Sequence, residues 1–330
     1  MTSNMNRFLF TRILKHFPSD ITFAFAYGSG VFHQDGNANP NNMIDLVFAV
    51  DKTKDWHAEN MERNPVHYSG LRFMGPSVIT AFQEKIGAGV YYNTLVHCEK
   101  RLIKYGVVQV DSLTEDLNKW NHLYISGRLH KPVNIIRRDN NKSLSAALQT
   151  NLRSALTTAL LLLPESFSEE QLFHTIAGLS YHGDFRMTFG ENKNKVHNIV
   201  KPNLKHFQEY YRGFLEEEDH LHWDKDKGIY QQETSSACIF SHLQRLPSHL
   251  QHLMIKNGDN RGGDLEEMLK RISEDKNQAK MVNEALQKIV EKSSRSQSLK
   301  AIPAAGVVKT VKYSSQKLMK MWKRSTSNNR

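Results

Sequence analysis

The sequence predicts an α+β protein: a mixed sheet with helices, then a mainly helical domain, for which a winged-helix form is considered, then a C-terminal amphipathic helix. Three observations carry this prediction. Short apolar runs bounded by turn residues fill the first 140 residues, a long helical pattern follows from residue 143, and a basic segment with helical periodicity ends the chain. The expected units are residues 1–140, 141–255, a polar helix over 264–291 and a basic helix over 300–324.

The first unit is expected to alternate strands with helices, as in a small sheet covered by helices. Residues 7–17 show weak helical amphipathicity, and they carry three basic residues and no acidic one. This segment is either a mitochondrial presequence or the first helix of the domain. Strands are predicted over 21–27, 44–50, 90–98, 107–110 and 133–136, and helices over 76–87 and 113–124.

The second unit begins with a helical run over 144–163, which stops at Pro164 because proline cannot continue a helix. Ser168 and Gln171 have the spacing of a capping box, so a second helix is expected from there to about residue 179. A Gly- and Asn-rich breaker at 257–263 precedes the polar helix. Residues 293–298, rich in serine, are expected to be a flexible linker.

The positive charge is concentrated at the C-terminal end. The 330 residues have a formal net charge of +10, and residues 292–330 contain seven lysines, three arginines and no acid, which leaves 34 basic and 34 acidic residues before them. A neutral body argues against nucleic acid as a partner, and a basic end favours an anionic surface. The two cysteines lie 140 positions apart, which argues against a disulfide framework or a thiolate zinc site.

The most informative stretch lies within the first predicted sheet. Gly28, Ser29 and Gly30 separate two apolar runs, and Asp45 stands near the start of the second run. Glycines leave backbone N–H groups open to a phosphate, and a carboxylate on the neighbouring strand can hold a divalent ion against that phosphate. Together these residues indicate a nucleotidyl-transfer site, and the sheet is then expected to be nucleotidyltransferase-like.

Six blocks of the sequence, taken in order, resemble the mitochondrial phosphatidate cytidylyltransferase family, also called the translocator assembly and maintenance protein family. The blocks are 27–32, the Asp45 strand, 87–93, 103–108, 127–133 and 180–187. The resemblance covers roughly residues 20–215 and the basic end. It implies that CTP and phosphatidic acid give CDP-diacylglycerol and pyrophosphate with Mg²⁺, at the matrix side of the mitochondrial inner membrane, as a peripheral protein that supplies cardiolipin synthesis.

The predicted catalytic and metal-binding residues are two aspartates. Asp45 is expected to bind Mg²⁺, but the positions two residues away are Met43 and Val47, where many nucleotidyltransferases place a second carboxylate. Asp51 has the correct strand parity yet lies ~20 Å along the strand, too far to share an ion. Asp184, in a Gly-Asp turn, is therefore the candidate for the second carboxylate.

The remaining site residues are expected to meet phosphate groups. Gly28, Ser29 and Gly30 would hold the triphosphate of the nucleotide, together with Lys195. The phosphate of phosphatidic acid would be bound by four cations. These are Lys104, Arg128, Lys131 and Arg186.

The basic end has the pattern of an amphipathic helix. At 100° per residue, its apolar and small side chains fall within an arc of about 160°, and its lysines fall outside that arc. Such a helix with a terminal tryptophan is typical of a membrane surface. Docking into a protein groove is the rival interpretation. The residues expected at the membrane are Val311, Leu318, Trp322, Lys312 and Lys320.

Two alternatives to a lipid enzyme stay open at this point. The first is a nucleotidyltransferase of another substrate, such as RNA or a small metabolite. The second is a non-enzymatic membrane scaffold for mitochondrial protein import, a role that the second family name suggests. No run of 18 apolar residues is present, so a membrane-spanning helix is not expected.

Overall fold

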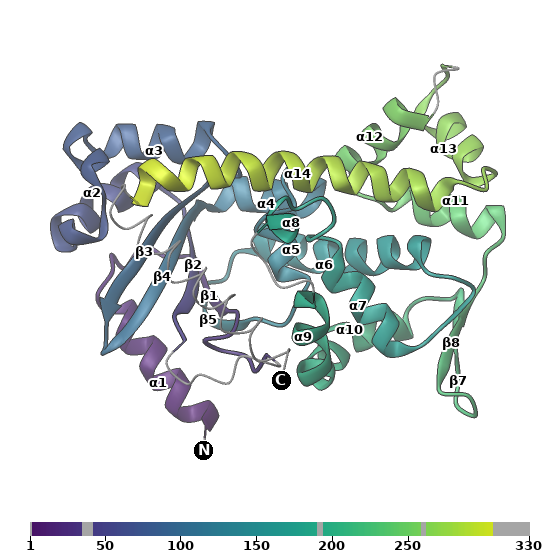
Figure 1. Cartoon of the computed structure of the whole chain (residues 1–330), viewed down its shortest axis with the longest axis horizontal. Coiled ribbons are helices and arrows are strands. Elements are labelled where there is room, and N and C mark those ends of the chain that lie inside the picture. The colour runs from purple at the N-terminus through teal and green to yellow at the C-terminus, as the bar shows by residue number, and fades with distance from the viewer. Residues whose placement is uncertain (1, 35–41, 190–193, 259–261, 306–330) are drawn as a thin grey trace.

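The computed structural model describes residues 2–34, 42–189, 194–258 and 262–305. It is a mixed α+β fold, with a five-stranded sheet at one end and a mainly helical part at the other (Figure 1). A long helix, α14, crosses both parts. Within these residues no helix is both long and apolar enough to span a bilayer.

The five-stranded sheet confirms the strands expected in the first unit. Its order is β3-β4-β2-β1-β5; β2 and β4 are parallel, and the other neighbours are antiparallel. The fourth strand is longer than predicted, because Glu99 and Lys100 adopt left-handed φ angles of 49° and 59° and close a tight turn without a glycine. The strands are β1 Phe23–Tyr27, β2 Ile44–Val50, β3 Val90–Cys98, β4 Arg101–Gln109 and β5 Asn134–Arg138.

Helices cover both faces of this sheet. Phe10 and Ile13 of α1 are buried against one face, so the N-terminal segment packs as a helix of the fold. The helix over 53–63 was not predicted. The elements are α1 Thr2–Leu14, α2 Thr53–Arg63, η1 Pro65–His67, η2 Gly70–Met74, α3 Pro76–Lys85, α4 Val110–Lys119 and α5 Ser126–Leu129.

The second part is mainly helical, as expected, with one small sheet of order β6-β8-β7. From α6 to β8 the order is one helix, a two-residue strand, the four helices α7 to α10 with the 3-10 helix η3 before α10, and then a hairpin; the winged-helix form stays a prediction. The capping box of Ser168 and Gln171 is present. The elements are α6 Lys142–Leu162, β6 Ser166–Phe167, α7 Glu169–Gly178, α8 Arg186–Phe189, α9 Lys195–Val200, η3 Lys201–Asn203, α10 Leu204–Glu216, β7 Leu221–Asp224, β8 Ile229–Gln232, α11 Ser236–Gln244 and α12 Ser248–Gly258.

Two expectations for the C-terminal region are wrong. The polar helix over 264–291 is divided between α13, Leu265–Ser273, and α14, Gln278–Ala305, and the expected linker 293–298 lies inside α14. Tertiary contacts explain the second error. The Gln297 side chain binds the Ala88 N–H at 3.1 Å and the Val90 carbonyl at 3.1 Å. Lys300 donates to the carbonyls of Gln83 and Ile86.

The basic helix predicted over 300–324 lies mostly outside the described residues. Residues 300–305 form the end of α14. All five residues expected at the membrane, from Val311 to Trp322, fall beyond residue 305, so this helix stays a prediction.

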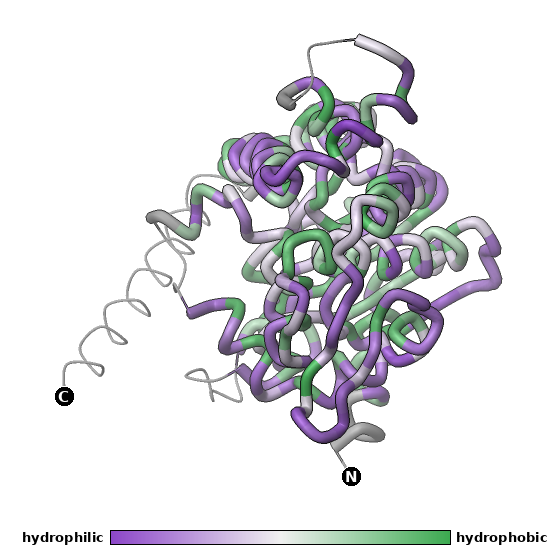
Figure 2. Tube along the Cα trace, turned by 90° about the vertical axis from the view of Figure 1, so that its right-hand side faces the viewer, coloured by the Kyte–Doolittle hydropathy of each residue, from purple (hydrophilic) through white to green (hydrophobic). Residues whose placement is uncertain are grey.

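The hydrophobic core is continuous between the two parts. Trp120 and Leu123, from the first 140 residues, belong to the same buried cluster as Leu172 of α7 and Leu286 of α14. Apolar segments run through the interior and polar segments lie outside (Figure 2). The boundary predicted at residue 140 is therefore bridged by packing, and α14 holds the helical part against the sheet.

Candidate functional site

The glycine-rich turn lies directly beside Asp45. Strand pairing places Tyr27, the last residue of β1, opposite Asp45 in β2. The Gly28 carbonyl then accepts from the N–H groups of Val31 at 3.1 Å and Phe32 at 2.9 Å, which closes a tight turn. Within the described residues, the N–H groups of Ser29 and Gly30 donate no hydrogen bond. Among the described residues, these two donors are therefore available to an anion.

The two glycines of the turn are needed for different structural reasons. Gly28 has a φ of +78°, and a Cβ there would lie 3.2 Å from Oδ2 of Asp45, so the bare backbone approaches the carboxylate closely. A Cβ at Gly30 would lie 2.5 Å from the carbonyl oxygen of Met43. The Gly30 position is therefore required by chain packing against the start of β2, and not by the approach of a phosphate.

Asp45 faces Lys104 across the parallel pair of strands. The two residues are in register, and Nζ of Lys104 lies 3.9 Å from Oδ1 of Asp45, beyond hydrogen-bond distance. The Lys104 ammonium also stands 4.3 Å from the ring centre of Tyr92. The Asp45 side chain is 24% exposed. A cation or a phosphate can therefore reach the carboxylate. Among the predicted cations, Lys104 is the one that lies beside Asp45.

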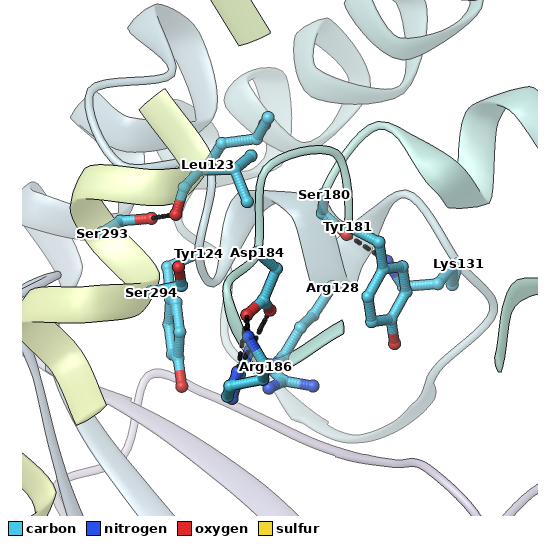
Figure 3. A pocket seen from close by; sticks show the side chains of 11 residues that line it. Leu123, Tyr124, Arg128, Lys131, Ser180, Tyr181, Asp184, Arg186, Ser293 and Ser294 are labelled. Carbon is cyan, nitrogen blue, oxygen red and sulfur yellow. Dashed lines mark hydrogen bonds and ion pairs between the residues drawn. The ribbon is translucent and has the colours of Figure 1, made fainter. Parts of the chain in front are cut away.

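A polar pocket gathers four of the predicted site residues (Figure 3). It lies between α5, the segment after α7, and α14. The sticks in Figure 3 show Asp184 and Arg186 turned toward each other, with Arg128 beside them. The four predicted residues at this pocket are Arg128, Lys131, Asp184 and Arg186.

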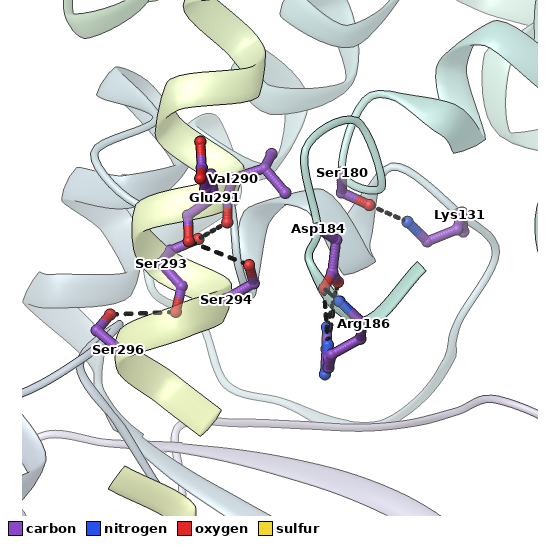
Figure 4. A network of polar contacts seen from close by, with 9 residues as sticks. All are labelled: Lys131, Ser180, Asp184, Arg186, Val290, Glu291, Ser293, Ser294 and Ser296. Atoms are coloured by element: carbon purple, nitrogen blue, oxygen red, sulfur yellow. Dashed lines mark hydrogen bonds and ion pairs between the residues drawn. The ribbon is translucent and has the colours of Figure 1, made fainter. Parts of the chain in front are cut away.

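Asp184 and Arg186 form a buried ion pair (Figure 4). Nε of Arg186 donates to Oδ1 of Asp184 at 2.9 Å, Nη2 donates to Oδ2 at 2.5 Å, and the backbone N–H of Arg186 donates to Oδ1 at 3.0 Å. The Asp184 side chain is 2% exposed. Both carboxylate oxygens are thus engaged, so binding a metal ion through Asp184 requires this pair to open. The role of Asp184 as a ligand stays a prediction.

The charge of Arg186 is maintained by its neighbours. Burial alone would lower the pKa of Arg186, but Tyr124 and Asp184 outweigh it and raise this pKa above its usual range. The guanidinium is therefore positive at all relevant pH values, and its side chain is 28% exposed. Asp184 orients this guanidinium, which lines the pocket.

Lys131 is a buried ammonium on the opposite wall. Nζ donates to the Gly127 carbonyl and to Oγ of Ser180 at 2.8 Å, and it lies 5.1 Å from the ring centre of Tyr181. Burial, and then the charges of Arg128 and Lys195, hold the pKa of Lys131 well below its usual range. An anion in the pocket would offset this repulsion, so the arrangement favours binding of a negative group.

Aromatic rings join the Asp45 cluster to the pocket. The Arg128 guanidinium lies 4.6 Å from the ring centre of Tyr27 and 5.5 Å from that of Tyr124. The Tyr27 and Tyr92 hydroxyls are 3.5 Å apart. Nε of Arg128 is buried with no partner among the described residues. The two clusters therefore form one continuous site, in which Arg128 is the central cation.

Tyr124 lies among positive charges. Burial alone would raise the pKa of its phenol, but the cations Arg186, Arg128 and Lys104 outweigh burial and lower that pKa. The same cations would attract the oxygens of a phosphate. The positive potential of this region is therefore a property of the site as a whole.

Lys195 lies at the edge of the site, near the segment that follows the glycine-rich turn. Its Nζ donates to Oε1 of Gln34 at 3.3 Å, and Nδ2 of Asn203 donates to the His33 carbonyl at 2.8 Å. These contacts bring α9 and η3 of the helical part to residues 33–34. The predicted site residues thus come together from both halves of the chain.

Sequence reasoning missed two groups of residues at this site. Tyr27 and Tyr92 lie within blocks that were singled out, yet neither was given a role; for Tyr27, its position next to Gly28 was a usable signal. Ser293 and Ser294 of α14 line the pocket. No local pattern marks these serines as pocket residues, because only the tertiary path of α14 brings them there.

A second polar cluster lies at the base of the β7–β8 hairpin. Donor atoms of His220, Glu233 and Cys238 lie within 4.8 Å of one another. Burial and nearby glutamates raise the pKa of the Cys238 thiol to about 11, and Nδ1 of His220 bonds Glu233 at 2.8 Å. The neighbouring His242 accepts from Arg245 at 2.6 Å. These side chains form a hydrogen-bond network that is separate from the pocket described above.

A turn with open N–H donors, an accessible carboxylate and a pocket lined by cations define a protein that binds phosphate-bearing substrates. A model of the family described as mitochondrial phosphatidate cytidylyltransferase matches residues 10–320. The chain belongs to this family.

Relatives named mitochondrial phosphatidate cytidylyltransferase align with nearly the whole chain. The Mus musculus protein is 50% identical over 318 residues, which cover 94% of each chain. The Danio rerio protein is 48% identical, with 95% of this chain and 94% of the relative covered. The Drosophila melanogaster protein is 44% identical over 336 residues, with 94% and 98% covered.

Proposed function

We propose that this protein is a phosphatidate cytidylyltransferase, which converts CTP and phosphatidic acid to CDP-diacylglycerol and pyrophosphate. A phosphate oxygen of phosphatidic acid attacks the α-phosphorus of CTP, and the bond from that phosphorus to the β-phosphate oxygen breaks. The observation that carries this proposal is the continuity of the Asp45 turn with the pocket of Arg128, Lys131 and Arg186. Two phosphate-bearing substrates need two adjacent anion sites.

The nucleotide is assigned to the glycine-rich turn. The open N–H groups of Ser29 and Gly30 would hold oxygens of the triphosphate, and Lys195 would approach from α9. The names of the relatives specify cytidylyl transfer, and this supports CTP as the nucleotide. Lys104, next to Asp45, would stand close enough to the reacting phosphate to offset its charge.

The donor set at Asp45 fits Mg²⁺. A carboxylate that is 24% exposed and lacks a short ion pair offers oxygen ligands, while substrate phosphates and water complete such a coordination shell. Bound there, Mg²⁺ would neutralise the triphosphate and position it for attack. Asp45 would hold the ion, and Asp184 stays the candidate for a second carboxylate if its pair with Arg186 opens.

The phosphate of phosphatidic acid is assigned to the pocket. Arg128 and Arg186 would bind its oxygens, and Lys131, which lines the same pocket, would add a further donor. A phosphate monoester is largely ionised at neutral pH, so no side chain has to remove a proton before attack. The role of the protein at this step is to orient two anions and to screen their repulsion.

We place the protein at the matrix side of the mitochondrial inner membrane, as a peripheral protein in the supply of cardiolipin. The word mitochondrial in the names of the relatives supports the compartment. The seven basic residues and absence of acid over 306–330 support contact with an anionic membrane through the predicted basic helix.

The test is product identification. Purified protein is incubated with each labelled nucleoside triphosphate, phosphatidate vesicles and Mg²⁺, with and without EDTA. We expect CDP-diacylglycerol from CTP alone, and none after chelation. Product with an RNA or a small metabolite, and none with phosphatidate, would favour the first alternative. Full rescue of cells by Asp45→Ala would favour the scaffold.

A further inference from the structure

Large apolar side chains are exposed in one region of the surface. In the described part of the chain ten such side chains are exposed, and six of them surround η1, η2, the end of α3 and the last turns of α14. Phe73 is 81% exposed and Leu299 is 70% exposed. We call this region the η2–α14 patch; its side chains are Val66, Phe73, Met74, Ile86, Leu299 and Ile302.

The patch follows a rigid seam between two distant segments. Oγ of Ser69 donates to the Pro303 carbonyl at 2.9 Å, and Lys300 donates to the Ile86 carbonyl at the end of α3. Figure 1 shows the last turns of α14, in yellow, running along α3. The exposed side chains flank these contacts. The two segments that carry them are therefore joined by hydrogen bonds, and the exposure of these side chains is built into the fold.

We propose that the η2–α14 patch inserts into the outer layer of a lipid bilayer and sets the protein on its membrane. Exposed apolar clusters mark interaction sites, because burial of each large side chain is favourable. The inference rests on the proposed function in one respect, that the second substrate is a membrane lipid.

The chain beyond the patch identifies the occupant. Residue 305 ends α14 at the patch, and residues 306–330 follow with five lysines, two arginines and no acid. A segment of this charge is attracted to an anionic membrane surface close to its starting point. The Arg72 guanidinium lies 4.8 Å from the ring centre of Phe73, so a basic group also accompanies the apolar side chains. Apolar groups flanked by cations match the boundary between acyl chains and anionic headgroups.

The position of the patch also suits delivery of the substrate. Ser294 lines the pocket and Ile302 lies in the patch, both on α14. Eight residues of helix separate them by ~12 Å at 1.5 Å per residue. This short separation would let a lipid of the contacted bilayer bring its headgroup toward the pocket while its acyl chains stay in the membrane.

The experiment reports insertion residue by residue. Met74→Cys is labelled with an environment-sensitive fluorophore in the full-length chain; Cys98 and Cys238 are buried and stay unlabelled. Leu265→Cys, exposed on α13 away from the patch, is the matched control. Vesicles of phosphatidylcholine with phosphatidylglycerol, with and without spin-labelled acyl chains, are then added. We expect a blue shift and quenching at position 74 and neither at position 265.

A second measurement uses surface variants that leave the buried seam intact. Phe73→Ser combined with Leu299→Ser should weaken vesicle binding by about a hundredfold, because each large apolar side chain contributes about tenfold when buried. Turnover of phosphatidate in vesicles should fall in parallel, and turnover of a water-soluble short-chain phosphatidate should not. If neither substrate is turned over, the proposed activity fails while the fluorescence result on the patch stands.

Three outcomes overturn the proposal. The label at position 74 is not quenched while the protein is bound to vesicles. The label is protected without lipid and becomes exposed when residues 306–330 are deleted, so that the tail covers the patch. The label is shielded from water without lipid, and the shielding increases with protein concentration, which would mean that a second copy of the protein covers the patch.

Discussion

The pair of Asp184 and Arg186 allows two roles of one carboxylate to be separated. In Arg186→Gln the guanidinium is lost. The Asp184 carboxylate, which is 2% exposed, then keeps only the backbone N–H of residue 186 as a donor and loses its paired cation. Loss of one partner of a buried pair destabilises a protein by about 3–5 kcal/mol. Because Arg186 is 28% exposed, water replaces part of the interaction, and we expect the lower end, about 3 kcal/mol.

The assay is a double-mutant cycle measured by urea unfolding. Asp184→Asn, Arg186→Gln and the double variant should give a coupling energy of about 2 kcal/mol, since the two side chains share three hydrogen bonds. Arg186→Gln should also lower kcat/KM for phosphatidate by about ten- to a hundredfold, the value of a charged hydrogen bond. The double variant should regain stability but not activity.

One result would refute this reasoning. If Asp184→Asn leaves the free energy of unfolding unchanged but shifts the Mg²⁺ concentration needed for half-maximal rate by a large factor, then Asp184 is a metal ligand. The pair with Arg186 would then be opened in the working protein, and Arg186 would need another partner.

Two further predictions concern the turn and the long helix. Gly28→Ala should lower kcat/KM strongly, because the new Cβ stands 3.2 Å from Oδ2 of Asp45. The control Gly228→Ala, at a φ of +65° with open space around it, should cost only about 1 kcal/mol of stability and leave activity intact. Equal effects of the two substitutions on kcat/KM would contradict the placement of the turn. Burial lowers the pKa of Lys300 to about 7 from 10.5. Between these values the unfolded chain binds more protons, so the free energy of unfolding should rise with pH across this window, and Lys300→Met should flatten that rise in pH-dependent urea titrations.

The sheet could be predicted from the sequence because its strands carry their own signals. The apolar runs over 44–50 and 90–98 agree to the residue with β2 and β3, respectively. The start of β4 was missed because Glu99 and Lys100 make a left-handed turn that no glycine or asparagine announces. Local pattern therefore located strands, but not every turn between them.

The path of α14 could not be predicted, for a physical reason. Serines over 293–298 have modest helix propensity, and alone they favour a linker. Buried contacts of Gln297 and Lys300 with β3 and α3 supply what local preference lacks. Partners more than 200 positions away in sequence leave no local signal.

The candidate site shows the same division. Glycines and a nearby carboxylate indicated the turn, and the cations of the pocket stood in recognisable blocks. The engagement of Asp184 by Arg186 and the rings that join the two clusters depend on tertiary geometry. Composition and spacing could suggest which residue types act, but not which of them are already paired.

The most direct test of the central claim compares two aspartates near opposite ends of β2. Initial rates of CDP-diacylglycerol formation are measured against Mg²⁺ concentration for the unmodified protein, Asp45→Asn and Asp51→Asn. Asp51 follows the far end of β2 and contacts Thr22, away from the turn. We predict a loss of at least about a hundredfold in kcat for Asp45→Asn, the scale expected for a group that stabilises reacting charge, and near-normal rates for Asp51→Asn. A folded Asp45→Asn protein with an unchanged rate and Mg²⁺ dependence would contradict the account.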